Sequence, residues 1–168
     1  EDMEKIREFF DGYTNIYFMT EMLTKIEVNS LLRDVDVFVS LHRAEGFGLG
    51  MAEAMLNGTP CIATNWSANT EFMDEKSACM VDYQLIELTE DIGPFKAGNR
   101  WADADVAQAA EYMKRLYADK AFYDIIKNNA LSHINQVLGE ERITVMMRER
   151  VEAIRKEAKE ALKKNEEK

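Results

Sequence analysis

Residues 40–55 read SLHRAEGFGLGMAEAM and join a strand to a helix through a glycine-rich turn. The apolar residues 37–39 before them predict a buried strand, and a helix is expected to begin near Gly48. Amide groups at a helix start are unpaired and carry about half a positive charge, so such a turn favours anions. Glycines at positions 46, 48 and 50 let a ligand approach the main chain closely.

Two carboxylates accompany this turn, because Glu45 lies before the helix and Glu53 lies within it. A carboxylate does not help to hold a phosphate, but it accepts hydrogen bonds from hydroxyl groups. The turn therefore suits a ligand that presents hydroxyls as well as phosphates, and a nucleotide sugar has both. Two simpler interpretations remain: Glu45 could only stabilise the helix start by its charge, and Glu53 could only face solvent.

The length and composition predict one globular domain. A chain of 168 residues with 46% hydrophobic content can bury roughly two thirds of its unfolded surface. No run of about 18 apolar residues and no signal-peptide pattern is found, so no segment is expected to cross a membrane. Cys61 and Cys79 lie in apolar runs, which predicts buried free thiols and a cytoplasmic protein. No Cys and His cluster suits zinc, and no metal is expected.

The charge is negative overall but uneven. The net charge is −10, yet residues 142–168 carry nine Lys and Arg against six Asp and Glu. The acidic body argues against nucleic acid, which needs a basic surface. The mildly basic end could contact a membrane surface or a partner, or it could be a solvated helix of mixed charge.

Short apolar segments alternate with amphipathic ones along most of the chain. Strands are expected at residues 15–19, 36–41, 61–64 and 78–83. Helices are expected at residues 1–11, 24–34, 48–57, 106–117, 119–137 and 140–164. Residues 84–103 contain two glycines and a proline and are expected to form a long irregular loop.

Several of these helices have predicted ends. Gly12 is expected to stop the first helix. Thr24, with Glu27 three residues later, has the pattern of a capping box. Asp103 and Asp119 are expected to cap two later helices.

Apolar strands that alternate with helices predict a parallel sheet covered on both faces. The expected fold class is therefore α/β. We expect residues 1–139 to form one domain that binds a nucleotide sugar, and residues 140–168 to form a C-terminal helix.

Residues 45–53 resemble the donor-binding motif of GT-B glycosyltransferases, in particular the retaining family 4, also called group 1. The family signature has two glutamates separated by seven residues, with Gly-Phe-Gly after the first, and this segment fits it. The resemblance covers about residues 15–115 and includes WADAD at residues 101–105. It implies a three-layer Rossmann-like sheet, the C-terminal half of a GT-B fold, with a helical C-terminal extension.

The resemblance also assigns roles to the residues of the turn. Glu45 is expected in the catalytic centre, where it accepts hydrogen bonds from hydroxyls of the donor sugar. Glu53, two turns along the helix, is expected to accept hydrogen bonds from the ribose. The amides of residues 47–49 are expected to bind the sugar or the distal phosphate. The donor-binding residues that the resemblance implies are His42, Gly46, Phe47, Gly48, Leu49 and Glu53.

Some side chains near the turn keep two interpretations. His42 fits a place in the site about as well as a structural role, and Arg43 is expected to point to solvent. Trp101 and Tyr83 either frame the site or only hold the loop of residues 84–103. The side chain of Phe47 is expected to be anchored in the core.

The resemblance implies an enzyme that transfers a hexose from a nucleoside-diphosphate sugar to a glycan or polysaccharide acceptor, with no cofactor and no metal. In such enzymes an N-terminal domain binds the acceptor, and the full-length protein can associate peripherally with the inner face of the membrane. The first strand of the donor-side half, with a loop whose Arg and Lys neutralise the diphosphate, is not found here. The chain is therefore expected to be a piece of a larger protein that binds nucleotide sugar weakly and is inactive alone.

The alternative function is a nucleotide-sugar-binding or interaction domain without catalysis. A Rossmann dehydrogenase is not favoured, because the turn lacks the Gly-x-Gly-x-x-Gly opening. An acidic ribose ligand about 20 residues later, at the end of a strand, is also missing.

Overall fold

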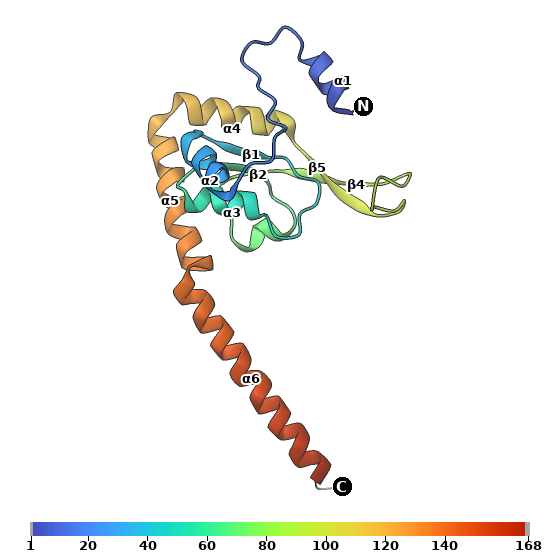
Figure 1. Cartoon of the computed structure of the whole chain (residues 1–168), viewed down its shortest axis with the longest axis vertical. Helices are drawn as coiled ribbons and strands as arrows, with labels where there is room; N and C mark the ends of the chain where they lie inside the picture. The colour runs from blue at the N-terminus through green and yellow to red at the C-terminus, as the bar shows by residue number, and fades with distance from the viewer. Residues whose placement is uncertain (1, 167–168) are drawn as a thin grey trace.

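The computed structural model describes residues 2–166. Three short parallel strands, a two-stranded hairpin and six α-helices form the described chain (Figure 1). The elements are, in order, α1 (Asp2–Phe9), α2 (Lys25–Asp34), β1 (Phe38–Ser40), α3 (Leu49–Leu56), β2 (Cys61–Thr64), the 3₁₀ helix η1 (Ala68–Glu71), β3 (Cys79–Val81), β4 (Tyr83–Glu87), β5 (Arg100–Ala104), α4 (Val106–Ala118), α5 (Lys120–Leu138) and α6 (Glu140–Glu166).

The parallel sheet is covered on both faces. Its strand order is β1-β2-β3, with Val39 beside Ile62 and Ile62 beside Cys79. Helix α4 contacts β2 and β3, while α3 contacts β1 and β2 and is itself packed by α2 and α5. This three-layer α/β arrangement confirms the predicted fold class.

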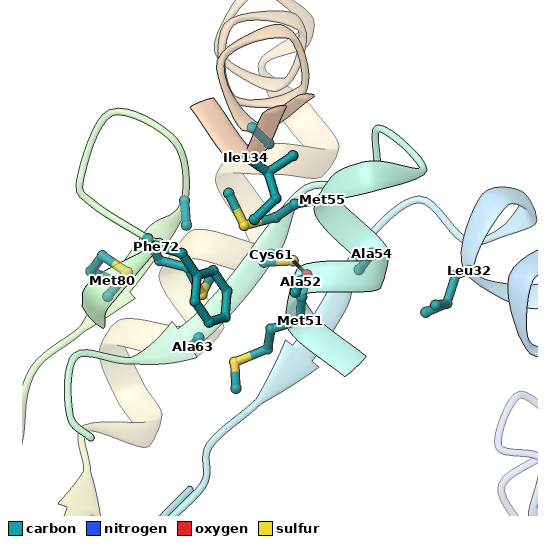
Figure 2. Close-up of a cluster of buried hydrophobic side chains, with 13 residues drawn as sticks. Leu32, Met51, Ala52, Ala54, Met55, Cys61, Ala63, Phe72, Met80 and Ile134 are labelled. Carbon is teal, nitrogen blue, oxygen red and sulfur yellow. Dashed lines mark hydrogen bonds between the residues drawn. The ribbon is translucent and has the colours of Figure 1, made fainter. Parts of the chain in front are cut away.

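Successive residues of β2 face opposite layers of the molecule. Cys61 and Ala63 belong to the cluster that α3 and α5 complete, shown in Figure 2. Ile62 belongs to the second cluster, which α4 completes. All four residues of β2 are buried, so a continuous apolar run at this position follows from burial on both faces.

Local sequence signals define several helix ends as predicted. The capping box is present, because the Glu27 N–H donates to the Thr24 hydroxyl and the Glu27 carboxylate accepts from the Thr24 N–H. Asp119 caps α5 through the Phe122 N–H. Helix α4 begins at Val106 as predicted, but its predicted cap is wrong by two residues: Asp105, not Asp103, is the N-cap, since β5 continues to Ala104.

The prediction of a strand at residues 15–19 is wrong. These residues form neither strand nor helix, and Tyr17 is 85% exposed. A strand needs a neighbour to satisfy its amide and carbonyl groups, and within residues 2–166 the parallel sheet begins at β1. Strand-forming composition alone does not supply that neighbour.

The prediction of an irregular loop over residues 84–103 is also wrong. Strands β4 and β5 pair antiparallel, from Tyr83 opposite Ala104 to Glu87 opposite Arg100. The hairpin extends away from the helical layers (Figure 1). The glycines and the proline that suggested a loop lie in the connection between the two strands, where they do not interrupt the pairing.

Helix α6 follows α5 after Gly139 and runs away from the rest of the molecule (Figure 1). Its exposed apolar side chains include Val145, Met147 and Ile154. No helix in the described part of the chain is long and apolar enough to cross a membrane. The end of the predicted segment 140–168, residues 167–168, lies outside the described residues, and the division into two domains stays a prediction.

Candidate functional site

The glycine-rich turn lies at the carboxyl end of β1 and leads into α3. Gly48 is the N-cap of α3 with a φ of 97°. The backbone at Gly48 therefore favours glycine, and a Cβ there would also crowd two side chains, at 2.8 Å from Met51 Cε and 3.2 Å from Phe72 Cζ. Gly46, in contrast, has open space where a side chain would stand, which leaves room for a ligand beside the turn.

Glu45 is held through both its side chain and its main chain. Its Oε1 accepts hydrogen bonds from the N–H groups of Gly46 at 2.9 Å and Phe47 at 3.3 Å. Ser67 Oγ donates to the Glu45 carbonyl at 2.7 Å and accepts from the Glu45 N–H at 3.2 Å. The Phe47 amide, which the family resemblance assigns to the donor, therefore faces the Glu45 carboxylate in this structure.

The start of α3 has the features of an anion-binding helix end. Gly48 supplies no side-chain cap, and the first turn carries no acidic residue. Its amide groups therefore lack a side-chain partner and lie at the positive end of the helix dipole. Leu49, the first residue of α3, is 66% exposed, so this helix end is open to solvent.

Glu53 is the fifth residue of α3, about one turn from the helix start rather than the predicted two. Its carboxylate forms an ion pair with Lys25, the first residue of α2. The Lys25 side chain is 63% exposed and the Glu53 side chain 27%. Exposed ion pairs contribute about 0–1 kcal/mol, so a ligand could displace Lys25 at little cost.

His42 is bonded to the protein through both ring nitrogens. Its Nε2 lies 2.9 Å from the Trp66 carbonyl and 3.0 Å from Asn69 Oδ1, and both of these atoms accept hydrogen bonds. Nε2 therefore carries the proton, and Nδ1 accepts from Ser40 Oγ at 3.3 Å. Asn69 is fully buried and donates from Nδ2 to the Thr64 carbonyl at 3.0 Å. These contacts favour the structural interpretation of His42.

Phe47 covers the core rather than entering it. Its ring packs on Phe72 with 5.3 Å between the ring centroids, yet its side chain is 42% exposed. Phe72 is the buried partner, at 1% exposure. The prediction that Phe47 is anchored in the core is therefore wrong, because Phe72 occupies the core position.

Arg43 connects the hairpin to the turn. Its guanidinium lies 4.8 Å from the centre of the Trp101 ring and 3.3 Å from Asp103 Oδ1. The main chain joins the same elements, because the Ala102 N–H donates to the Arg43 carbonyl at 3.0 Å. Arg43 thus has hairpin partners, although its side chain stays 48% exposed. The ring of Tyr83 packs on Trp66, in the loop after β2, with 5.2 Å between the ring centroids.

One cavity of about 420 Å³ lies away from the turn. It is lined by Asp36, Val37, Met113, Leu116, Tyr117, Lys120 and Tyr123. Residues 36–37 precede β1 whereas the turn follows it, so this cavity opens at the opposite end of that strand. Within residues 2–166, no group of three or more His, Cys, Asp and Glu is arranged to hold a metal ion.

Two partners of the glutamates, Ser67 and Lys25, were not predicted from the sequence. Ser67 is 22 residues from Glu45, and Lys25 is 28 residues from Glu53. The contact between Ser67 and Glu45 could have been predicted, because Ser67 follows β2, Glu45 follows β1, and the loops after neighbouring parallel strands lie at the same edge of a sheet. Lys25 has no comparable signal.

Comparisons with known proteins identify the family. A family model described as "Glycosyl transferases group 1" matches residues 1–119. A comparison with curated proteins found no match. Among solved structures, the chain is similar to the crystal structure of the C-terminal domain of a glycosyl transferase group 1 family protein (LpcC) from Francisella tularensis.

The match to that domain has a TM-score of 0.58 and 22% sequence identity, and it covers 80% of this chain. It covers 60% of the other chain, so this chain spans little more than half of that domain's length. At this identity the likeness concerns the fold, and it agrees with the expected C-terminal half of a GT-B glycosyltransferase. The family match extends over most of the sequence, and the chain therefore belongs to the group 1 glycosyltransferases.

Proposed function

We propose that this chain is the donor-binding domain of a retaining glycosyltransferase that transfers a hexose from a nucleoside-diphosphate sugar to a glycan or polysaccharide acceptor. The observation that carries the proposal is the arrangement of the turn. Glu45 stands beside the open space at Gly46, directly before a helix start that has no side-chain cap. This arrangement offers a hydroxyl acceptor and an anion site next to each other.

Glu45 is suited to the sugar. Only Oε1 accepts the hydrogen bonds from the Gly46 and Phe47 amides, so Oε2 is available to accept hydrogen bonds from hydroxyl groups. The bonds to the two amides also fix the direction of the carboxylate before a ligand arrives. A fixed acceptor loses little entropy when it binds.

The start of α3 is suited to the diphosphate. In retaining enzymes of this family the diphosphate leaves from the same face that the acceptor attacks, so its growing negative charge must be stabilised. Arg43 and Lys25 are cations near the two glutamates, and both are engaged with acidic residues, Asp103 and Glu53. The paired carboxylates cancel the positive charge of these two cations, so little net positive charge stands beside the helix start, and we propose that the chain alone binds donor weakly and does not catalyse transfer.

The test measures binding to the chain of three ligand pairs: UDP with UDP-glucose, GDP with GDP-mannose, and ADP with ADP-glucose. Glu45→Ala should raise the Kd of the nucleotide sugar at least about tenfold and leave the Kd of its nucleotide unchanged, because a hydrogen bond to a charged group contributes about 1.5–3 kcal/mol. Glu53→Ala should weaken both members of a pair about equally, because both contain the ribose. Glu111→Ala, an exposed glutamate on α4, is the matched control and should change neither.

An unchanged Kd for every nucleotide sugar in the Glu45→Ala variant would refute the assignment of this carboxylate to the sugar. Turnover of any of the three donors by the chain alone would refute the proposed lack of independent activity. The alternative function is binding without catalysis, and the engaged state of Arg43 and Lys25 favours it for the chain by itself. Donor binding by a longer protein that contains this chain, with no transfer to any acceptor, would establish that alternative.

A further inference from the structure

Ser67 has a backbone conformation that serine rarely adopts. Its φ is 79° and its ψ is −157°, and it is the only residue other than glycine with a positive φ within residues 2–166. This combination of angles is almost confined to glycine, because a Cβ crowds the main chain there. A serine at such a position is therefore expected to have side-chain contacts that offset the backbone strain.

The hydroxyl of Ser67 holds the main chain of Glu45 at two points. It donates to the Glu45 carbonyl at 2.7 Å and accepts from the Glu45 N–H at 3.2 Å. The carbonyl of Ser67 is fixed in turn, because it accepts from the Thr70 hydroxyl at 2.7 Å and the Thr70 N–H at 3.3 Å. Glycine would adopt the same backbone without strain, but it could not make the two bonds to Glu45.

The two hydrogen bonds from Ser67 to the Glu45 main chain also fix the position from which the Glu45 side chain extends. The carboxylate lies against the two residues that follow it, where Oε1 accepts hydrogen bonds from the amides of Gly46 and Phe47. A displacement of the Glu45 main chain would therefore move the carboxylate relative to the start of α3. The distance between a sugar acceptor and a phosphate site matters for a ligand that must reach both.

We infer that Ser67 is a positioning residue that fixes Glu45 for the sugar of the donor. This inference rests on the proposed function, because it takes Glu45 as a sugar ligand. Ser67 contributes to the affinity for the sugar and not to the affinity for the nucleotide. A serine that only supports the fold would affect both affinities alike.

The experiment compares Ser67→Gly with Ser67→Ala in the chain, using the three ligand pairs named above and a thermal unfolding midpoint for each variant. Both variants lose the hydroxyl, but only alanine keeps a Cβ in the strained backbone. Ser67→Gly should keep a midpoint close to the wild type, and Ser67→Ala should unfold at a lower temperature. In both variants the Kd of the nucleotide sugar should rise about threefold or more, with the Kd of the nucleotide unchanged.

Ser77→Ala is the control for a destabilised loop. Ser77 is a buried serine whose hydroxyl bonds to Asp74 and not to Glu45. Its variant should lower the unfolding midpoint and leave the ratio of the two Kd values unchanged. In the double variant Glu45→Ala with Ser67→Gly, the serine change should add nothing, because its effect acts through Glu45.

The outcomes separate this inference from the proposed function. If Glu45→Ala weakens binding of the nucleotide sugar but Ser67→Gly does not, the positioning role is refuted and the proposed function stands. If Ser67→Gly weakens nucleotide and nucleotide sugar equally, the serine is structural and the inference is refuted. If Glu45→Ala changes neither ligand, or the wild type binds none of them at millimolar concentration, the proposed function fails and the inference fails with it.

Discussion

Replacing Asn69 by alanine should destabilise the chain by an amount that its contacts determine. Asn69 is fully buried at the start of η1. Its amide joins two segments at the edge of the sheet, because Nδ2 donates to the Thr64 carbonyl and Oδ1 accepts from His42 Nε2, each at 3.0 Å. The substitution removes both hydrogen bonds and leaves a small cavity.

The expected loss is about 2–3 kcal/mol of unfolding free energy. Two neutral hydrogen bonds contribute about 2 kcal/mol together, and the lost packing adds up to about 1 kcal/mol. The loss stays at this level because neither partner becomes unsatisfied. The Thr64 carbonyl still accepts from the Trp66 N–H at 2.8 Å, and His42 Nε2 still lies 2.9 Å from the Trp66 carbonyl.

Urea unfolding followed by circular dichroism measures this loss as a lower midpoint with an unchanged slope. Asn135→Ala is the matched control, because Asn135 is exposed on α5 and donates only to the Leu131 carbonyl. The unfolding free energy of that variant should equal that of the wild type or exceed it by about 0.5 kcal/mol, since alanine favours a helix. A loss below about 1 kcal/mol for Asn69→Ala would show that the two buried bonds do not act as described.

Two further predictions concern titration. Burial raises the pKa of the Cys61 and Cys79 thiols from 9.0 to about 12, so thiol reagents should label them only after unfolding. Above about pH 9 the unfolded thiols ionise while the folded ones stay protonated, so the unfolding free energy should fall toward pH 12, and less steeply in a Cys61→Ala, Cys79→Ala variant. Burial tends to raise the pKa of Asp74, but hydrogen bonds from Ser77, the neighbouring His133 and a hydrogen bond from Lys76 outweigh it and hold the pKa below 3.8. The ionised Asp74 carboxylate stabilises the fold above that pH, and this stability should be lost as the pH falls through its lower folded pKa. Urea unfolding midpoints measured between pH 5 and 2 should therefore decrease less for Asp74→Asn than for the wild type.

The elements that the sequence predicts well have local signals. The capping box of Thr24 and Glu27 specifies the start of α2, and the apolar residues of β2 are buried on both faces as expected. These features depend on neighbours within a few residues. Reading along the chain therefore suffices to find them.

The errors concern pairing between distant residues. Residues 15–19 have the composition of a strand but no partner among the described residues. Residues 83–104 contain turn-forming residues, yet Tyr83 pairs with Ala104 across a long connection. Local composition reports propensity, and strand pairing is decided by tertiary contacts.

The candidate site shows the same division. The spacing of Glu45 and Glu53 and the need for Gly48 follow from the motif and the turn. Their partners Ser67 and Lys25 do not, because the loop after β2 and the start of α2 reach the turn only in the folded chain. Spacing identified the candidate residues, and the fold determines what holds them.

The contacts that shape the turn have a consequence for folding. Glu45 meets Ser67 and His42 meets Asn69 across 22 and 27 residues, so the turn acquires its geometry only after β2 has joined β1. Opening of the turn and separation of these two strands should then be one cooperative event, and the amide of Glu45 should exchange with solvent no faster than those of β2. A donor bound at the turn would consequently stabilise the whole sheet against unfolding, rather than one surface loop.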